Sequence, residues 1–427
     1  MSAEFLMPSW LSDEQARRIQ REFGTPVFAY DQATLEAQAA TLLGVPNAFG
    51  LTARYAMKAC PTAAVVRVLA NAGLHIDASS GYEVERALAI GIPADRIQLT
   101  AQQLPDNLEG LVDAGVLFNA CSLAQIEAFG ARCPTRSLSI RLNPGLGSGH
   151  SNRTNVGGPS SSFGIWHAHL DEVLAIAKRH GLTITGVHTH IGSGSDPAVW
   201  QRVSLMSLEL CARVPTAMRL NLGGGFKVGR MPDEASTDLS QVGRPIADAF
   251  RAFAARHGRE LRLELEPGTF LVANAGALVA TVIDVVDTGG DGYRFVKLDT
   301  GMTEVLRPSL YGAQHPIGVV PVDREEAGSA DYLVVGHCCE SGDVLTPARG
   351  DPEGLLPRRL RNPRIGDAVV IGGAGAYCSG MAAVHYNSFP EAAEVMLAKD
   401  GRTIELIRRR QTLAQVTQNE LTPTFLL

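Results

Sequence analysis

Polar residues that could take part in catalysis or ligand binding follow several apolar, strand-like segments of this 427-residue chain. A lysine that loses water in the mouth of a fold has a lowered amine pKa and becomes ready to bond an aldehyde. Consecutive glycines leave their amides open to a phosphate, and a proline fixes the carboxylate that precedes it. An imidazole stacks on a planar ligand, transfers protons or binds metal. The residues in these positions are Lys58, Asp77, Asn143, His190, Gly223, Gly224, Gly225 and Glu266.

Each of these residues also has a plainer interpretation. Lys58 alone is typical of a rim lysine that reaches water, and His190 of a hydrogen-bonded core histidine. The glycines fit a flexible turn, and Glu266 fits a rim acid. His188 shares a strand face with His190, but no nearby carboxylate completes a set of ligands, so we predict no metal site. Together, however, an amine, an imidazole, an anion cradle and a fixed carboxylate are what pyridoxal 5'-phosphate needs, and we predict this cofactor.

The elements that must position these residues alternate between strand-like and helical patterns. Eight predicted strands give the strand count of an α/β fold of the (β/α)8 TIM-like barrel type, whose catalytic residues gather at the carboxyl ends of the strands. A doubly wound sheet is the alternative, but no G-x-G-x-x-G follows the first strand. The predicted strands are Thr52–Met57, His75–Ala78, Arg96–Thr100, Val116–Ala120, Leu138–Leu142, Ile184–His190, Met218–Leu222 and Arg262–Glu266. The predicted helices include Ala63–Ala72, Tyr82–Ile90, Leu170–His180, Val199–Ala212 and Ile246–His257.

The pattern changes past Gly276 into short segments rich in valine and isoleucine, which predict a mostly-β C-terminal domain. These segments are Leu278–Val286, Phe295–Leu298, Tyr332–Val335, Ala368–Ile371 and Thr403–Arg408. Asp400-Gly401 is typical of a hairpin turn before the last of them. The early strand Val27–Tyr30 is expected to join this domain. We therefore predict an N-terminal segment 1–31 that contributes to the β domain, a cofactor-binding barrel at 32–275 and the C-terminal β domain at 276–427.

Composition limits the partners. Lys and Arg number 38 against 44 Asp and Glu, which gives a net charge of −6 and argues against a nucleic-acid partner. The first residues lack the basic start and apolar run of a signal peptide, and we find no apolar run of transmembrane length. Seven cysteines without C-x-x-C spacing fit a reducing cytoplasm. We expect no membrane partner.

The chain resembles the diaminopimelate/ornithine decarboxylase family of barrel-type pyridoxal-phosphate enzymes over nearly its whole length. In the barrel the resemblance is carried by Tyr-Ala-Met-Lys58-Ala-Cys, Arg141-Leu-Asn-Pro-Gly, Gly-His150-Ser-Asn-Arg-Thr-Asn, Phe163-Gly-Ile, His188-Thr-His-Ile-Gly-Ser-Gly, Gly223-Gly-Gly-Phe and Glu266-Pro-Gly. In the β domain it is carried by Arg307-Pro-Ser-Leu-Tyr311-Gly, Cys339-Glu-Ser-Gly-Asp343, Gly375-Ala-Tyr377, Tyr386-Asn-Ser and Arg408-Arg-Arg-Gln-Thr.

This resemblance implies a decarboxylase in which Lys58 bonds the cofactor aldehyde, His190 stacks on the ring and Glu266 pairs with the ring nitrogen. Asp77 and Gly268 join the cofactor-binding set, and Ser193, the three glycines and Tyr377 would hold the phosphate. Cys339 resembles the family's general acid, which a second subunit supplies, so the resemblance implies a homodimer with shared active sites. Substrate contacts would come from Arg307, Tyr311, Glu340, Tyr377 and Thr269. Arg307 and Glu340 favour meso-2,6-diaminopimelate, which would give L-lysine.

The sequence also departs from the family pattern. Thr269 stands where an arginine usually helps hold the distal carboxylate, and His337-Cys338 stands where Gly-Pro is more familiar. Another amino acid with a polar distal group, such as ornithine, lysine or arginine, is therefore an alternative substrate. Alanine racemases share the fold, but they usually place arginine at the ring nitrogen, so Glu266 argues against racemisation. A catalytically silent homologue that binds a partner protein would tend to lose the cofactor residues, and this chain keeps them.

Overall fold

A computed structural model describes residues 7–146, 157–190, 192, 197–322 and 328–426, and the chain divides into two compact units. The barrel unit comprises Leu35–Val228 and Ala235–Leu271. The sheet unit is assembled from the chain up to Thr34, the short segment Gly229–Glu234 and the chain from Val272 onward. Six residues within the barrel part of the sequence thus belong to the sheet unit, which sequence patterns did not predict.

The barrel unit is a closed ring of parallel strands, as predicted. Successive strands pair in parallel, and pairing of β5 with β6 closes the ring. The ring strands are β2 (Leu51–Ala56), β3 (His75–Ala78), β4 (Ile97–Leu99), β5 (Leu117–Ala120), β6 (Ser137–Asn143), β8 (Thr183–Thr189), β9 (Arg219–Asn221) and β10 (Arg262–Leu265). A two-residue strand that we did not predict, β7 (Ile165–Trp166), pairs with β6 outside the ring. The ring strands read as apolar runs because both of their faces are covered.

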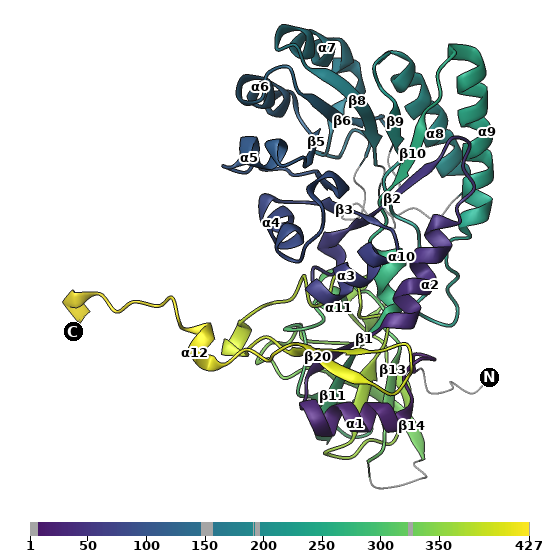
Figure 1. Cartoon of the computed structure of the whole chain (residues 1–427). Helices are drawn as coiled ribbons and strands as arrows, with labels where there is room; N and C mark the ends of the chain where they lie inside the picture. Colours follow the sequence, from purple (N-terminus) through teal and green to yellow (C-terminus); the bar gives the residue numbers. More distant parts are fainter. Residues whose placement is uncertain (1–6, 147–156, 191, 193–196, 323–327, 427) are drawn as a thin grey trace. The chain divides into compact units, whose positions relative to one another are not determined.

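Helices surround this ring, as Figure 1 shows. They are α2 (Gln32–Leu43), α3 (Ala63–Asn71), α4 (Gly81–Ala89), α5 (Leu108–Asp113), α6 (Leu123–Arg132), α7 (Leu170–Arg179), α8 (Pro197–Ala212), α9 (Leu239–His257) and the single turn α10 (Thr269–Val272). Side-chain caps set several starts, since Ser80 and Ser122 accept the amides of Glu83 and Gln125. The predicted start of α9 at Ile246 was wrong, because Asp238 caps the helix two turns earlier and Pro245 lies inside it.

A mixed sheet forms the sheet unit. Its main path runs β17 (Arg358–Arg361), β14 (Ser329–Val335), β12 (Arg294–Leu298), β11 (Gly276–Asp287), β1 (Val27–Asp31), β19 (Ala393–Leu397) and β20 (Ile404–Arg408), while β18 (Ala368–Ile371) pairs with β11 and with β13 (Ile317–Val320). The early strand β1 lies centrally, antiparallel to β11 and parallel to β19, with Val27 opposite Val279 and Ala393. The predicted hairpin between β19 and β20 is confirmed, with Gly401 in the left-handed region at φ 65°.

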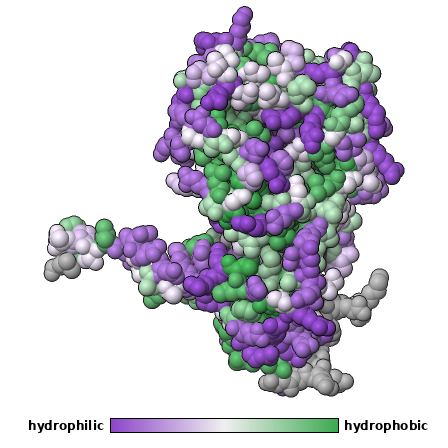
Figure 2. Space-filling model, viewed as in Figure 1, coloured by the Kyte–Doolittle hydropathy of each residue, from purple (hydrophilic) through white to green (hydrophobic). Residues whose placement is uncertain are grey.

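Smaller elements complete the sheet unit. They are α1 (Asp13–Phe23), α11 (Arg307–Tyr311), β15 (Pro347–Ala348), β16 (Asp351–Leu355) and α12 (Leu413–Val416). Helix α1 begins with a capping box of Ser12 and Gln15, and its Ile19 packs into a buried cluster with Val27, Val279 and Val395. Hydrophilic residues are spread over the face in Figure 2, with hydrophobic ones among them. No helix in the described ranges has the length and apolarity to cross a membrane.

Candidate active site

Lys58 lies in a single 3₁₀ turn, Met57–Ala59, directly after β2, and its side chain is exposed. The turn is fixed from both sides. The Tyr55 hydroxyl donates to the Cys60 carbonyl at 2.9 Å, and a Cβ on Gly268 would lie 2.9 Å from the Cβ of Ala59. Gly268 therefore lets the segment after β10 pack closely against the turn. The barrel holds Lys58 at the carboxyl end of its strand, as the sequence predicts.

Glu266 follows β10, is 8% exposed and has a partner at each carboxylate oxygen. His188 Nε2 lies 3.1 Å from Oε1, and Asn221 Nδ2 donates to Oε2 at 2.9 Å. Asn119 in turn holds His188, since its Nδ2 lies 2.7 Å from His188 Nδ1. Burial favours the neutral acid, but the interaction with His188, by charge and then by hydrogen bond, outweighs it and holds the pKa of Glu266 well below its usual range. Glu266 is thus a fixed anion.

Asp77, at the end of β3, behaves in the opposite way. It is 2% exposed, and Thr100 Oγ1 donates to its Oδ1 at 2.7 Å. Burial, and then the negative charge of Glu266, raise the pKa of Asp77 well above its usual value. Two neighbouring carboxyl groups in one dry site avoid carrying two charges, so one stays ionised and the other keeps its proton.

His190 follows β8 and packs on the glycine turn. The Gly224 amide donates to His190 Nδ1 at 3.3 Å, which assigns the ring hydrogen to Nε2. Burial, and then the charge of Arg141, lower the pKa of His190 well below its usual value, so the ring is neutral. A Cβ on Gly223 would lie 2.4 Å from Nδ1, and Gly223 has a φ of 77°. Gly223 is required here by the close approach of the ring, whereas a Cβ on Gly224 would lie 2.5 Å from the Glu266 carbonyl oxygen. The Gly223 and Gly224 amides both donate within the chain, Gly223 to Asn221 Oδ1 at 2.7 Å.

Sequence reasoning missed several residues of this network. Thr100, Asn119 and Asn221 lie at the ends of β4, β5 and β9, the same positions that identified Lys58 and Glu266. His188 had been considered only as a metal ligand, whereas it contacts Glu266. Among the described residues, no group of three or more His, Cys, Asp or Glu side chains is placed to hold a metal ion. Ser193 lies outside the described residues.

The remaining predicted residues belong to the sheet unit, apart from half-buried Thr269, which begins α10. Arg307 and Tyr311 bound the short helix α11. Arg307 Nη1 lies 3.0 Å from His315 Nε2, and Ser309 Oγ donates to the Gly342 carbonyl at 2.8 Å, which joins α11 to the loop that carries Cys339 and Glu340.

Cys339 and Glu340 are exposed, and a neighbouring loop holds both of them. Asn387 Oδ1 accepts the Cys339 amide at 2.8 Å, and the Tyr386 hydroxyl donates to Glu340 Oε2 at 3.3 Å. The Gly342 amide, and then Tyr386, lower the pKa of Glu340.

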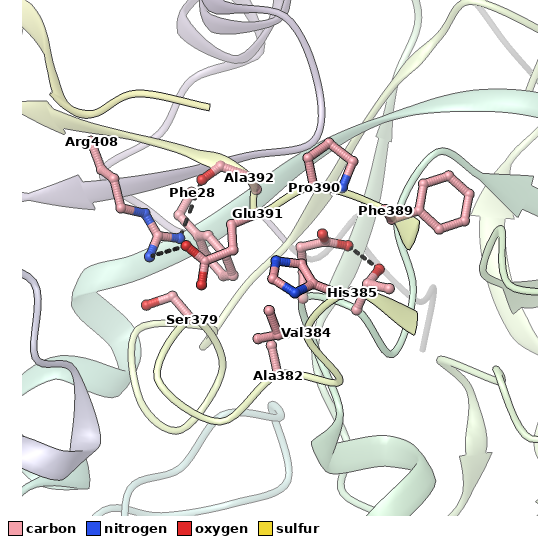
Figure 3. Close-up of a pocket in the computed structure, with 12 residues that line it drawn as sticks. Phe28, Ser379, Ala382, Val384, His385, Phe389, Pro390, Glu391, Ala392 and Arg408 are labelled. Carbon is pink, nitrogen blue, oxygen red and sulfur yellow. Dashed lines mark hydrogen bonds and ion pairs between the residues drawn. The ribbon is translucent and has the colours of Figure 1, made fainter. Parts of the chain in front are cut away.

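The loop that holds this pair is itself tightly built. The ring of Phe389 stacks on His337 with centroids 3.6 Å apart. Asn387 has a φ of 50°, and Tyr377, further back in the same stretch, has a φ of 56°, so non-glycine residues here adopt the left-handed conformation. Figure 3 shows a pocket beside this loop, lined by His385, Phe389 and Arg408 among others, in which Arg408 Nη2 donates to the Ala392 carbonyl at 3.2 Å.

The barrel residues fit pyridoxal phosphate by the chemistry of their donor set. A fixed anion at Glu266 suits a protonated ring nitrogen, and a neutral imidazole at His190 suits the face of an aromatic ring. Lys58 offers the amine that an aldehyde needs. The arrangement supports chemistry in which a bound planar cofactor gains electrons from a substrate.

Comparisons with known proteins agree with this chemistry. The model of the pyridoxal binding domain of pyridoxal-dependent decarboxylases matches residues 37–273. The chain is 37% identical over 425 residues to the diaminopimelate decarboxylase of Streptomyces coelicolor, covering 98% of this chain and 94% of that protein. It is similar to a crystal structure of diaminopimelate decarboxylase with TM-score 0.89 at 32% identity, covering 98% of each chain. It is also similar to the Helicobacter pylori diaminopimelate decarboxylase complexed with L-lysine, with TM-score 0.81 at 27% identity, covering 94% and 98%.

Proposed function

The chain belongs to the family of pyridoxal-dependent decarboxylases, and on that basis we propose that it converts meso-2,6-diaminopimelate to L-lysine and CO2 with pyridoxal phosphate. The substrate follows from relatives named diaminopimelate decarboxylase that match the chain over almost its full length. The structural observation that carries the chemistry is the fixed anion at Glu266, held by His188 and Asn221.

Pyridoxal phosphate, when bound, draws electrons from the bond to the departing carboxyl group, most effectively when its ring nitrogen is protonated. Glu266 would accept a hydrogen bond from that nitrogen and keep it protonated, because the carboxylate is ionised and its two oxygens are oriented by His188 and Asn221. His190 would cover one face of the ring, and Lys58 would hold the aldehyde. Protonated Asp77 adds no second negative charge to the ring site.

Residues of the sheet unit supply the other functions in this proposal. Arg307 and Tyr311 would bind the distal carboxylate, and Glu340 the distal amine. The exposed thiol of Cys339 would deliver the proton that replaces the lost carboxyl group. Asn387 and Tyr386 support these roles, because they fix the Cys339 amide and the Glu340 carboxylate.

We also propose a homodimer in which each chain lends Cys339 and Glu340 to the site of the other, acting in the cytoplasm. Exposure of both residues supports the sharing. The C-terminal arm after β20 runs away from the sheet in Figure 1 and exposes large apolar side chains: Leu413, Leu421, Phe425 and Leu426. Contact of these side chains with a second copy of the chain would bury them, which supports the homodimer. The seven described cysteines are free thiols, which suits a reducing compartment.

The test is release of CO2 from meso-diaminopimelate by the purified protein with added pyridoxal phosphate, beside ornithine, lysine and arginine as competing substrates. We expect release from diaminopimelate alone, with L-lysine as the product. Borohydride reduction followed by peptide mass spectrometry should place the cofactor on Lys58. Lys58→Ala should lose both the CO2 release and the labelled peptide. Glu266→Gln should keep the trapped cofactor but lower turnover by about 100-fold. Preferred turnover of another amino acid would overturn the substrate, and labelling elsewhere would overturn the role of Lys58.

A further inference from the structure

Arg230 lies in the segment Gly229–Glu234, which leaves the barrel part of the sequence to join the sheet unit. The segment is anchored along its length. Asn274 Nδ2 donates to the Gly229 carbonyl at 2.9 Å, Arg349 pairs with Asp233 at 2.9 Å, and Glu234 Oε2 accepts the Arg230 amide at 3.0 Å. The backbone that carries Arg230 is therefore held by a hydrogen bond from Asn274 at one end and by Glu234 at the other.

Arg230 and Arg307 are tied to two adjacent residues of the chain, Arg230 directly to Gly373 and Arg307 to Gly372 through His315. Arg230 Nε donates to the Gly373 carbonyl at 3.0 Å. Arg307 Nη1 donates to His315 Nε2 at 3.0 Å, and His315 Nδ1 donates to the Gly372 carbonyl at 2.9 Å. The side chain of Arg230 also packs so closely that a Cβ on Gly373 would lie 2.9 Å from its Cδ. The segment a few residues before Tyr377 thus bonds Arg230 directly and Arg307 through His315, and the charge of Arg307 acts on Arg230.

These two positive charges have no ion-pair partner within the described part of the chain, and Glu234 acts on Arg230 without forming an ion pair with it. Neither arginine takes part in an ion pair there, and Arg230 Nη2 is buried without a hydrogen-bond partner among those residues. Glu234 contacts the backbone amides of Arg230 and Met231 with its Oε2. Burial, and then the charge of Arg307, lower the pKa of Arg230 to about 9. Two positive charges that are close together and half-buried destabilise each other. An anionic ligand that binds between them would remove this destabilisation.

We propose that Arg230 and Arg307 together bind the distal carboxylate of the substrate, with the free Nη2 of Arg230 as one of the donors. The inference rests on the proposed function and deepens it by assigning a specificity-determining residue that the sequence motifs do not contain. A carboxylate offers two oxygens that match N–H donors from two guanidinium groups. Decarboxylation leaves the distal carboxylate untouched, so the product L-lysine still carries it, whereas 1,5-diaminopentane does not.

The test compares Arg230→Gln and Arg230→Lys with the wild-type holoenzyme. For Arg230→Gln we expect KM for meso-diaminopimelate to rise by roughly 10- to 100-fold, with kcat changed by less than about threefold. Binding of L-lysine, measured by calorimetry, should weaken by a similar factor, while binding of 1,5-diaminopentane should not change. Arg230→Lys should lie between, because an ammonium keeps the charge but loses the planar donor pair. Arg359→Gln is the control, since Arg359 lies on β17 and contacts Ser329 and Asp331 at the surface.

The outcomes separate this inference from its premise. Unchanged KM and L-lysine binding in Arg230→Gln would overturn the inference, as would a wild type that binds L-lysine no better than 1,5-diaminopentane. Weaker pyridoxal phosphate affinity with unchanged L-lysine binding would also overturn it, because the arginine would then serve the cofactor phosphate. If the wild type releases no CO2 from diaminopimelate, the proposed function is wrong. The role of Arg230 in binding a carboxylate is still tested in that case, because calorimetry with L-lysine needs no turnover. A melting curve of each variant confirms that it is folded, and Arg230→Lys replaces Arg230→Gln if the latter is not.

Discussion

Arg307 donates a hydrogen bond from Nη1 to Nε2 of His315 at 3.0 Å, and the Gly372 carbonyl fixes the same imidazole through Nδ1 at 2.9 Å. Burial, and then the charges of Arg307 and Arg230, lower the pKa of His315 well below its usual value. A neutral imidazole can orient a guanidinium without cancelling its charge. Arg307 is therefore aimed but remains available to an anion.

Replacing His315 should weaken substrate binding through Arg307. For His315→Ala we expect KM for meso-diaminopimelate to rise by about 10-fold, because the guanidinium loses the acceptor that orients it. His315→Gln offers a carbonyl oxygen in place of Nε2 and should recover part of the loss. Steady-state kinetics check both variants, and an equal KM for His315→Ala and wild type would contradict the positioning role.

Asp77→Asn tests whether the buried carboxyl group keeps its proton. The folded-state pKa of Asp77 is raised, so its contribution to stability is present at low pH and is lost as the pH rises through that pKa. Asparagine imitates the protonated form and does not titrate. We expect the free energy of unfolding of the wild type to fall relative to Asp77→Asn as the pH rises from about 4, near the pKa of a free aspartic acid, until it has passed the raised pKa of Asp77, measured by urea unfolding. Exposed Asp248 provides the control, because Asp248→Asn should run parallel to the wild type.

Gly223→Ala should disturb the cofactor site as well as stability. The new methyl group would meet the His190 ring at 2.4 Å, on a backbone with φ 77°. Gly258→Ala is a matched control, because Gly258 has φ 63° and no atom within 4 Å of a Cβ. We expect a loss of about 1 kcal/mol for Gly258→Ala from backbone strain alone, and of at least about 2 kcal/mol for Gly223→Ala. Pyridoxal phosphate titration should show weaker affinity in Gly223→Ala only, and equal affinities would refute the contact with His190.

Asn387 should control turnover through Cys339. Its Oδ1 accepts the Cys339 amide at 2.8 Å, and its backbone has φ 50°. Asn387→Gly leaves the left-handed backbone unstrained and removes only the acceptor, so we expect kcat to fall by about 10-fold with unchanged pyridoxal phosphate affinity. Asn387→Asp retains an acceptor oxygen and should keep most of the activity. Equal kcat values for the glycine and aspartate variants would show that the bond does not matter.

The sequence was sufficient to predict the barrel and the residues at its strand ends. Parallel strands buried on both faces read as apolar runs, and Lys58 and Glu266 are visible because each follows such a run. The contact of His188 with Glu266 was not predictable in this way, because it depends on which strands become neighbours around the ring. The role of Gly229–Glu234 was missed since six residues carry no periodicity. Asn387 belongs to the Tyr386-Asn-Ser motif, but its bond to the Cys339 amide was not predictable because a loop in the left-handed conformation leaves no pattern beyond a tolerant residue type.

The central place of β1 in its sheet has a consequence for folding during synthesis. Val27 pairs with Ala393, so this early strand leaves the ribosome long before its parallel neighbour β19 exists. At roughly 5–20 residues per second, the barrel has time to form while β1 and α1 wait for their partners. Interrupting translation after β10 should therefore yield a protease-resistant barrel preceded by an N-terminal stretch that proteases still cut. The sheet is therefore the last part of the nascent chain to form.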